Sequence, residues 1–136
     1  YTSHFKPGGT ALIAAGRITG RIIATFQDPM GRWSAISLIG AGSRQLTVIS
    51  AYQVCNTRSD RNTKARSMAA ATQQQAMIDI SDPTPPMHPR EKFRIDLLLA
   101  FVQERQHEGH EIILMADFNE AYGSDPMGLM HIASNM

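Results

Sequence analysis

The chain has 136 residues and a mass of 15.0 kDa, which fits one ordinary domain. Its hydrophobic share of 43% is enough for a buried core, and its single cysteine, Cys55, excludes an intrachain disulfide and every zinc site built on several cysteines. The longest run of strongly apolar residues, Leu97–Val102, is far shorter than the roughly 18 residues that a membrane-spanning helix needs. The chain begins at Tyr1 rather than Met and reads as a fragment. No targeting signal is visible in it, which favours an intracellular location.

The net charge of +1 hides two oppositely charged halves. Residues 1–78 carry nine Lys and Arg against two acids, a balance of +7, and residues 79–136 carry four against ten acids, a balance of −6. A basic half beside an acidic half is typical of a site that handles a phosphate substrate together with a divalent cation. Random segregation of solvated surface charge explains the same pattern equally well.

Short apolar runs separated by glycine-rich turns predict strands in the first part of the chain. Thr10–Ala15 is interpreted as a buried strand, with Arg21–Phe26 as its hairpin partner across the connection Gly16–Gly20. Trp33–Ile39 and Leu46–Tyr52 are the next two strands. Four strands joined by such turns predict an antiparallel meander.

The second part of the chain changes to helical spacing. Asn62–Ile80 is predicted to be helical, and Pro89 to His107 is the strongest helix, ended by Gly109. Glu111–Ala116 then reads as a fully apolar strand, and Pro126 to Ala133 begins another helix. The strongest helix carries its core-facing stripe at Phe93, Leu97, Leu98, Phe101, Val102 and Arg105.

The most informative polar residues, Asp117 and Asn119, directly follow an apolar strand. Since side chains alternate along a strand, both should project to one side while Phe118 enters the core. A carboxylate beside an amide suits a phosphodiester site: the carboxylate can bind or lie close to Mg²⁺ or orient a water, and the amide can hold the water or a phosphate oxygen. The alternative is an Asx turn in which both side chains merely cap backbone groups.

Three motifs stand in an order that resembles a known family. Gly8-Gly9-Thr10 matches a glycine pair that opens a core strand, Tyr52 stands where a later strand ends in an aromatic residue or His facing the phosphate, and Ala116-Asp117-Phe118-Asn119 matches a G-D-x-N motif with Ala in place of Gly. The chain, from about Lys6 to Ile132, thereby resembles the endonuclease/exonuclease/phosphatase superfamily, the deoxyribonuclease I-like fold. Its sequence is also similar to copies of this domain found beside reverse transcriptases in eukaryotic mobile elements.

The resemblance implies an α+β fold, with mostly antiparallel strands in a two-sheet β-sandwich, flanking helices, and portions missing at both ends of a single domain over residues 1–136. It implies hydrolysis of DNA or RNA phosphodiesters with Mg²⁺ or Mn²⁺. Asp117, which is also the possible metal ligand, would orient or deprotonate the attacking water. Asn119 would position that water or contact the scissile phosphate, and Tyr52 would hydrogen-bond a phosphate oxygen. For Tyr52, packing against a neighbour is the alternative.

A basic loop after the third predicted strand would supply contacts to backbone phosphates in a nuclease. A solvated helix start is the other interpretation of these residues. They are Arg58, Arg61, Lys64 and Arg66.

Two segments of the family pattern are absent from this chain: a strand bearing a metal-binding Glu before Gly8, and a terminal S-D-H motif. We therefore expect the chain alone to be weakly active or inactive. The alternatives are a phosphoinositide or lipid phosphatase of the same fold, and a catalytically dead remnant or binding module.

Other candidate residues point to structural roles. His107 and His110 could share a metal, but Gly109 breaks the helix between them, and we expect both to be solvated. Cys55 has no nearby His and is interpreted as a small buried residue rather than a nucleophile.

Overall fold

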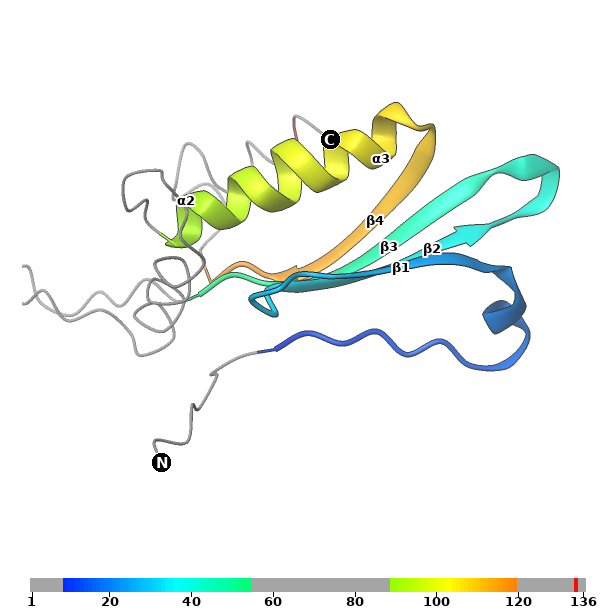
Figure 1. The fold of residues 1–136 in the computed structure, drawn as a ribbon, viewed down its shortest axis with the longest axis horizontal. Coiled ribbons are helices and arrows are strands. Elements are labelled where there is room, and N and C mark those ends of the chain that lie inside the picture. Colours follow the sequence, from blue (N-terminus) through cyan, green and yellow to red (C-terminus); the bar gives the residue numbers. More distant parts are fainter. Residues whose placement is uncertain (1–8, 55–88, 120–133, 135–136) are drawn as a thin grey trace, which may run out of the picture.

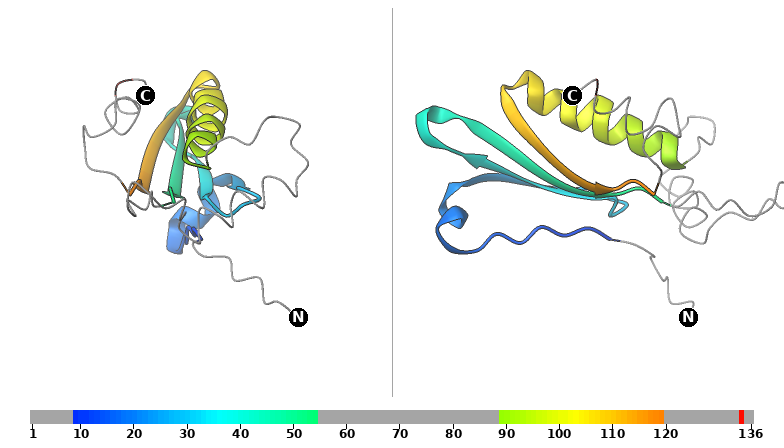
Figure 2. Two further views of the ribbon diagram at one scale, coloured as in Figure 1. Left: turned by 90° about the vertical axis from the view of Figure 1, so that its left-hand side faces the viewer. Right: turned by 180° about the vertical axis from the view of Figure 1, so that it is seen from behind.

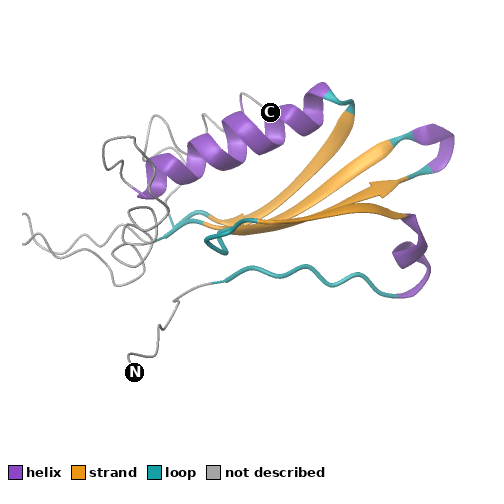
Figure 3. Cartoon of the chain, in the orientation of Figure 1, coloured by secondary structure: helices purple, strands orange, loops and turns teal. Residues whose placement is uncertain are grey.

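A four-stranded sheet with one long helix packed on one of its faces forms the body of the molecule (Figures 1 and 3). A computed structural model of the chain describes residues 9–54, 89–119 and 134. The helices predicted at Asn62–Ile80 and Pro126–Ala133 lie outside these residues. In spatial order the strands are β1 (Ile22–Gln27), β2 (Trp33–Ile39), β3 (Gln45–Tyr52) and β4 (His110–Asp117).

The sheet is mostly antiparallel, so the predicted α+β class is confirmed. β1, β2 and β3 form an antiparallel meander, whereas β4 returns after the helix and pairs parallel to β3. A parallel return is the ordinary result when a helix connects two neighbouring strands. The β1–β2 turn closes with a hydrogen bond from Gly31 N to Asp28 O of 2.9 Å, and Gly31 takes a φ of 71°, which glycine adopts without steric cost.

The prediction of a buried strand at Thr10–Ala15 is wrong. These residues are extended but pair with no strand, and Ile13 is 92% exposed. The expected hairpin partner instead pairs with β2. Gly16–Arg21 forms a 3₁₀ helix (η1) rather than a tight hairpin turn, and this longer connection leads the preceding segment beneath the sheet, on the side away from the helix (Figure 1).

The predicted helix from Pro89 to His107 is confirmed. It comprises α2 (Pro89–Arg94), a π-helical segment η3 (Ile95–Val102) and α3 (Gln103–His107). The buried stripe explains the change of pitch, since Phe93, Leu97 and Val102 are spaced four and then five residues apart. Hydrogen bonds between residues five apart bring the second pair onto the same side of the helix. Gly109, at φ 87°, ends it.

The hydrophobic core lies between this helix and the sheet. Figure 2 shows the helix on one side of the strands, from the end and from behind. Aromatic side chains meet at its centre: the Trp33 and Phe93 rings lie 6.3 Å apart and the Phe26 and Phe101 rings 5.0 Å apart, both edge to face. The predicted core role of the helix stripe is confirmed by Leu97, at 0% exposure.

The opposite face of the sheet is exposed along its two edge strands, β1 and β4, whereas Leu38 of β2 is buried there. Alternate residues of each strand point there, and Ile23, Ile113 and Met115 remain 47–49% exposed. β4 is therefore not the fully buried strand that its apolar sequence suggests, because it lies at the sheet edge and only its even-numbered residues face the helix.

A chain of buried polar groups crosses the helix-facing side of the sheet. Ser37 Oγ lies 2.7 Å from Thr47 Oγ1, which lies 2.9 Å from His110 Nδ1. The expectation that His110 is solvated is wrong. His110 is the first residue of β4, and its imidazole lies on the covered face, where it is a hydrogen-bond partner for the Thr47 hydroxyl. His107, the last residue of α3, is exposed as expected.

Candidate functional site

Tyr52 and Asp117 meet at one edge of the sheet. They are partners in the parallel register of β3 and β4, and each is the last residue of its strand. Paired residues of neighbouring strands point to the same face. Because Ala51 and Ala116 face the helix, Tyr52 and Asp117 face the open side, where Asp117 is exposed and Tyr52 half-buried.

Asn119 is brought to this edge by a turn rather than by strand alternation, which stops at Asp117. The backbone N–H of Asn119 donates to Asp117 Oδ1 over 3.0 Å, the geometry of an Asx turn. Asn119 has φ 49°, in the left-handed region that Asn tolerates better than most residues. Phe118 enters the core as predicted, with its ring 6.3 Å from that of Phe93.

The side chain of Asn119 is fixed against β3. Its Nδ2 donates to the backbone carbonyl of Gln53 over 2.6 Å. A carbonyl only accepts, so this contact identifies the amide nitrogen and directs Oδ1 away from β3. In the part of the chain that the structure describes, Asn119 thereby keeps one N–H donor and its carbonyl oxygen for another group. Among the described residues, Asp117 Oδ2 has no hydrogen-bond partner, so this carboxylate also keeps an acceptor.

Gln53 is the residue at this edge that sequence reasoning missed. It is fully buried, its backbone N–H donates to Asp117 O over 2.9 Å, and its side-chain Nε2 lies 3.4 Å from Arg90 O. The signal available in the sequence was a polar residue directly after a run of strand-forming residues, at a position where alternation along the strand points the side chain to the core. Arg90, also buried, donates from Nη1 to Val54 O over 2.7 Å and so holds the start of α2 against the end of β3.

The structure does not describe the other residues of the predicted site. The four basic residues lie outside the described residues, as do Gly8 and Cys55. Gly9 opens no strand, but Thr10 contacts β2 on the open face, with its Oγ1 3.0 Å from Ser34 Oγ.

Metal ligands are sparse in the part of the chain that the structure describes. It contains no group of three or more His, Cys, Asp and Glu side chains placed to hold a metal ion. At the Tyr52–Asp117 edge, Asp117 is the one carboxylate of the predicted site. The described histidines stand apart from it, since His110 begins β4 and Asp117 ends it.

No protein-family model, curated protein or solved structure matches this chain. Within residues 9–54, 89–119 and 134, no helix is long and apolar enough to cross a membrane. The α+β fold and the residues at the sheet edge are therefore the observations on which function can be argued.

Proposed function

We propose that this chain belongs to a metal-dependent phosphodiesterase domain of the endonuclease/exonuclease/phosphatase type, acting on DNA or RNA in its complete form. The observation that carries the proposal is the register of β3 and β4. It aligns Tyr52 with Asp117 on one face, and the following turn ties Asn119 to both strands. A phenol from one sequence motif and a carboxylate and an amide from a second, distant motif thus share one sheet edge.

The contacts of Asp117 and Asn119, and the place of Tyr52 at the end of β3, support a chemical role for each side chain. Asp117 Oδ2 accepts a hydrogen bond from the attacking water and orients it, or takes its proton. The second N–H of Asn119 holds that water or a phosphate oxygen, because the first is committed to Gln53 O. The Tyr52 hydroxyl hydrogen-bonds a non-bridging phosphate oxygen. Holding water and phosphate in one geometry lowers the barrier by avoiding the entropy cost of bringing them together.

The candidate site offers Mg²⁺ one carboxylate ligand, that of Asp117. Proteins bind Mg²⁺ through one or two carboxylates plus waters and substrate phosphates. Asp117 supplies one such carboxylate on an exposed position. When bound, the ion would offset negative charge on the phosphate.

The open face of the sheet supports the finer proposal of a two-sheet sandwich. Ile113 and Met115, on the same side of β4, present apolar surface there at roughly half exposure, and so does Ile23 on the other edge strand. Exposed apolar side chains of this kind are typical of a face that packs against further protein. The proposed second sheet of the complete domain would cover it.

One observation favours the rival interpretation, a catalytically dead remnant. The Asx turn gives Asp117 and Asn119 a structural role that needs no substrate. The two interpretations differ in what Asp117→Ala does: both predict a loosened turn, and only the enzyme loses a chemical step.

The test is nicking of supercoiled plasmid with Mg²⁺ in low salt, by this chain and by the chain extended by its genomic flanks. We expect the extended form to nick DNA and Asp117→Ala to lower its rate about 10²–10⁴-fold, the usual contribution of a positioned acid or base. Glu111→Ala is the matched control, since it removes an exposed carboxylate from the same face and strand at the other end.

Other outcomes separate the alternatives. No nicking by a folded extended form, together with phosphate release from phosphoinositide vesicles that Asp117→Ala abolishes, would indicate the phosphatase. Absence of both activities would indicate the dead remnant. Equal losses in Asp117→Ala and Glu111→Ala would contradict the assigned role of Asp117.

A further inference from the structure

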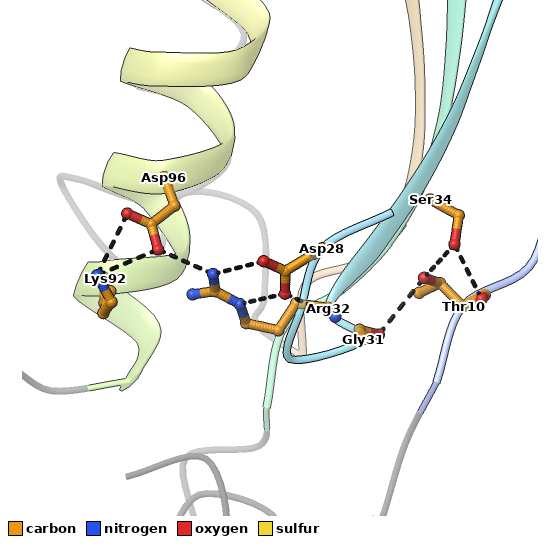
Figure 4. Close-up of polar contacts among 7 residues, drawn as sticks. All are labelled: Thr10, Asp28, Gly31, Arg32, Ser34, Lys92 and Asp96. Carbon is orange, nitrogen blue, oxygen red and sulfur yellow. Dashed lines mark hydrogen bonds and ion pairs between the residues drawn. The ribbon is translucent and has the colours of Figure 1, made fainter. Parts of the chain in front are cut away.

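Arg32, at the end of the β1–β2 turn, is the centre of a buried ion cluster (Figure 4). Its Nε and Nη2 donate to the two oxygens of Asp28 over 2.8 and 2.9 Å, and its backbone N–H donates to the same carboxylate over 3.1 Å. Nη2 also contacts Asp96 on the helix at 2.8 Å, and Lys92 lies 3.3 Å from Asp96. The guanidinium therefore joins the turn to the helix.

The same residue contacts the candidate site through its backbone. The carbonyl oxygen of Arg32 accepts the N–H of Tyr52 over 2.8 Å, at the last residue of β3. On the other side of β3, Asp117 O accepts the N–H of Gln53, and Gln53 O accepts from Asn119 Nδ2. The end of β3 is thus clamped between Arg32 and the Asp117–Asn119 turn.

The surroundings of Arg32 favour the charged form of its guanidinium. Burial by itself lowers the pKa of Arg32, but hydrogen bonds and charge attraction from Asp28 and Asp96 outweigh this, and the net pKa lies above the ordinary value. A raised pKa means that the stabilising charge is present below the unfolded-state value and is lost only as pH rises through the folded value. Arg32 stays charged at every neutral or mildly alkaline pH.

We propose that Arg32 is a positioning residue that sets where Tyr52 lies relative to Asp117 and Asn119. Its guanidinium is held by Asp28 and by Asp96 on the helix, so its carbonyl offers Tyr52 N–H a fixed acceptor. The consequence for hydrolysis rests on the proposed function, whereas the placement of the end of β3 does not.

The matched control is Arg105, a second shielded arginine of the helix–sheet interface. Its guanidinium lies 5.0 and 5.6 Å from the rings of Phe26 and Phe101, and it pairs with Glu104 and Glu108. It lies on α3 and contacts Phe26 of β1, a strand that β2 separates from β3. Arg32→Lys and Arg105→Lys each replace a planar fork by a point charge.

The experiment is amide hydrogen exchange by NMR on the full chain and on both variants. We expect Arg32→Lys to accelerate exchange at Tyr52 and Gln53 at least tenfold relative to Ile49, a buried residue in the middle of β3. Arg105→Lys should change that ratio less than twofold. Equal acceleration at Tyr52, Gln53 and Ile49 would mean that Arg32 only stabilises the fold, and would overturn the proposal.

A second variant guards against misfolding of Arg32→Lys. Asp96 is partly exposed, so Asp96→Asn keeps an acceptor while weakening the tether to the helix. It should accelerate exchange at Tyr52 about threefold relative to Ile49. An unchanged ratio in Asp96→Asn would contradict the role of the helix in the clamp.

Kinetics separate this proposal from the proposed function. In a form that nicks plasmid, Arg32→Lys should lower kcat about tenfold and change KM less than twofold, because misplaced groups cost most in the transition state. If no form nicks DNA, the proposed function fails while the exchange ratios still decide the role of Arg32.

Discussion

The two faces of the sheet carry similar apolar side chains and have very different exposure. On the helix-facing side Trp33, Ile49 and Ala51 are 7% exposed or less, whereas Ile113 and Met115 on the open side are 47% and 49% exposed. Alternation along each strand produces both faces. The difference comes from the helix, which covers one of them, so the strand pattern alone says little about where the core lies.

The largest difference in unfolding free energy between the two faces is expected when a side chain is truncated to Ala on each of them. Leu97→Ala removes a fully buried side chain and should lower the free energy of unfolding by about 2–5 kcal/mol, the range for such truncations. Met115→Ala should cost about 1 kcal/mol or less, because half of that side chain is already in water. Urea unfolding followed by the fluorescence of Trp33, the single tryptophan, measures both. Similar losses would mean that the open face is covered in solution.

A loss of unfolding free energy of intermediate size is expected when the buried hydrogen bonds among Ser37, Thr47 and His110 are broken. Thr47→Val leaves His110 Nδ1 and Ser37 without the hydroxyl between them, and should cost about 1–3 kcal/mol of unfolding free energy. Thr25→Val makes the same chemical change at an exposed position of β1 and should stay within about 0.5 kcal/mol. Chemical denaturation of the two variants checks this. A neutral Thr47→Val would show that the hydroxyl contributes nothing beyond its shape.

The smallest effect is expected at an ion pair on the open end of the sheet. Arg44 and Glu111 join the starts of β3 and β4, with side chains 74% and 61% exposed. Exposed pairs contribute little because water and salt screen them, so Arg44→Ala should change the unfolding free energy by less than about 0.5–1 kcal/mol. Thermal melts at low and high salt measure it. A loss well above 1 kcal/mol that persists in high salt would contradict the comparison.

Much of the fold could be predicted from local patterns. β2 has the predicted bounds, the helix from Pro89 to His107 is found where its stripe indicated, and β4 extends the predicted strand by one residue at each end. These segments were predictable because their turns, caps and apolar spacing all agree. The structure of Thr10–Ala15 was not predictable in this way, because an apolar run forms a strand only where a neighbouring strand offers hydrogen bonds.

The candidate site was predictable in its parts and not in its assembly. Asp117, Asn119 and Tyr52 were identified from motifs, and Phe118 was expected in the core. The sequence carried no sign that Gln53 would tie Asn119 to β3, or that Arg32 would hold Tyr52, since those contacts join positions up to 66 residues apart.

The sequence by itself determined the bounds of β1 to β4 to within one residue and those of the long helix, because backbone preferences and apolar spacing act between near neighbours. Only the tertiary structure decided which sheet face is covered, that β4 runs parallel to β3, and that His110 is buried. Those outcomes depend on packing between distant segments, where one helix can bury a single face of the sheet and a parallel return aligns the ends of two strands. The Tyr52–Asp117 edge is a product of that alignment.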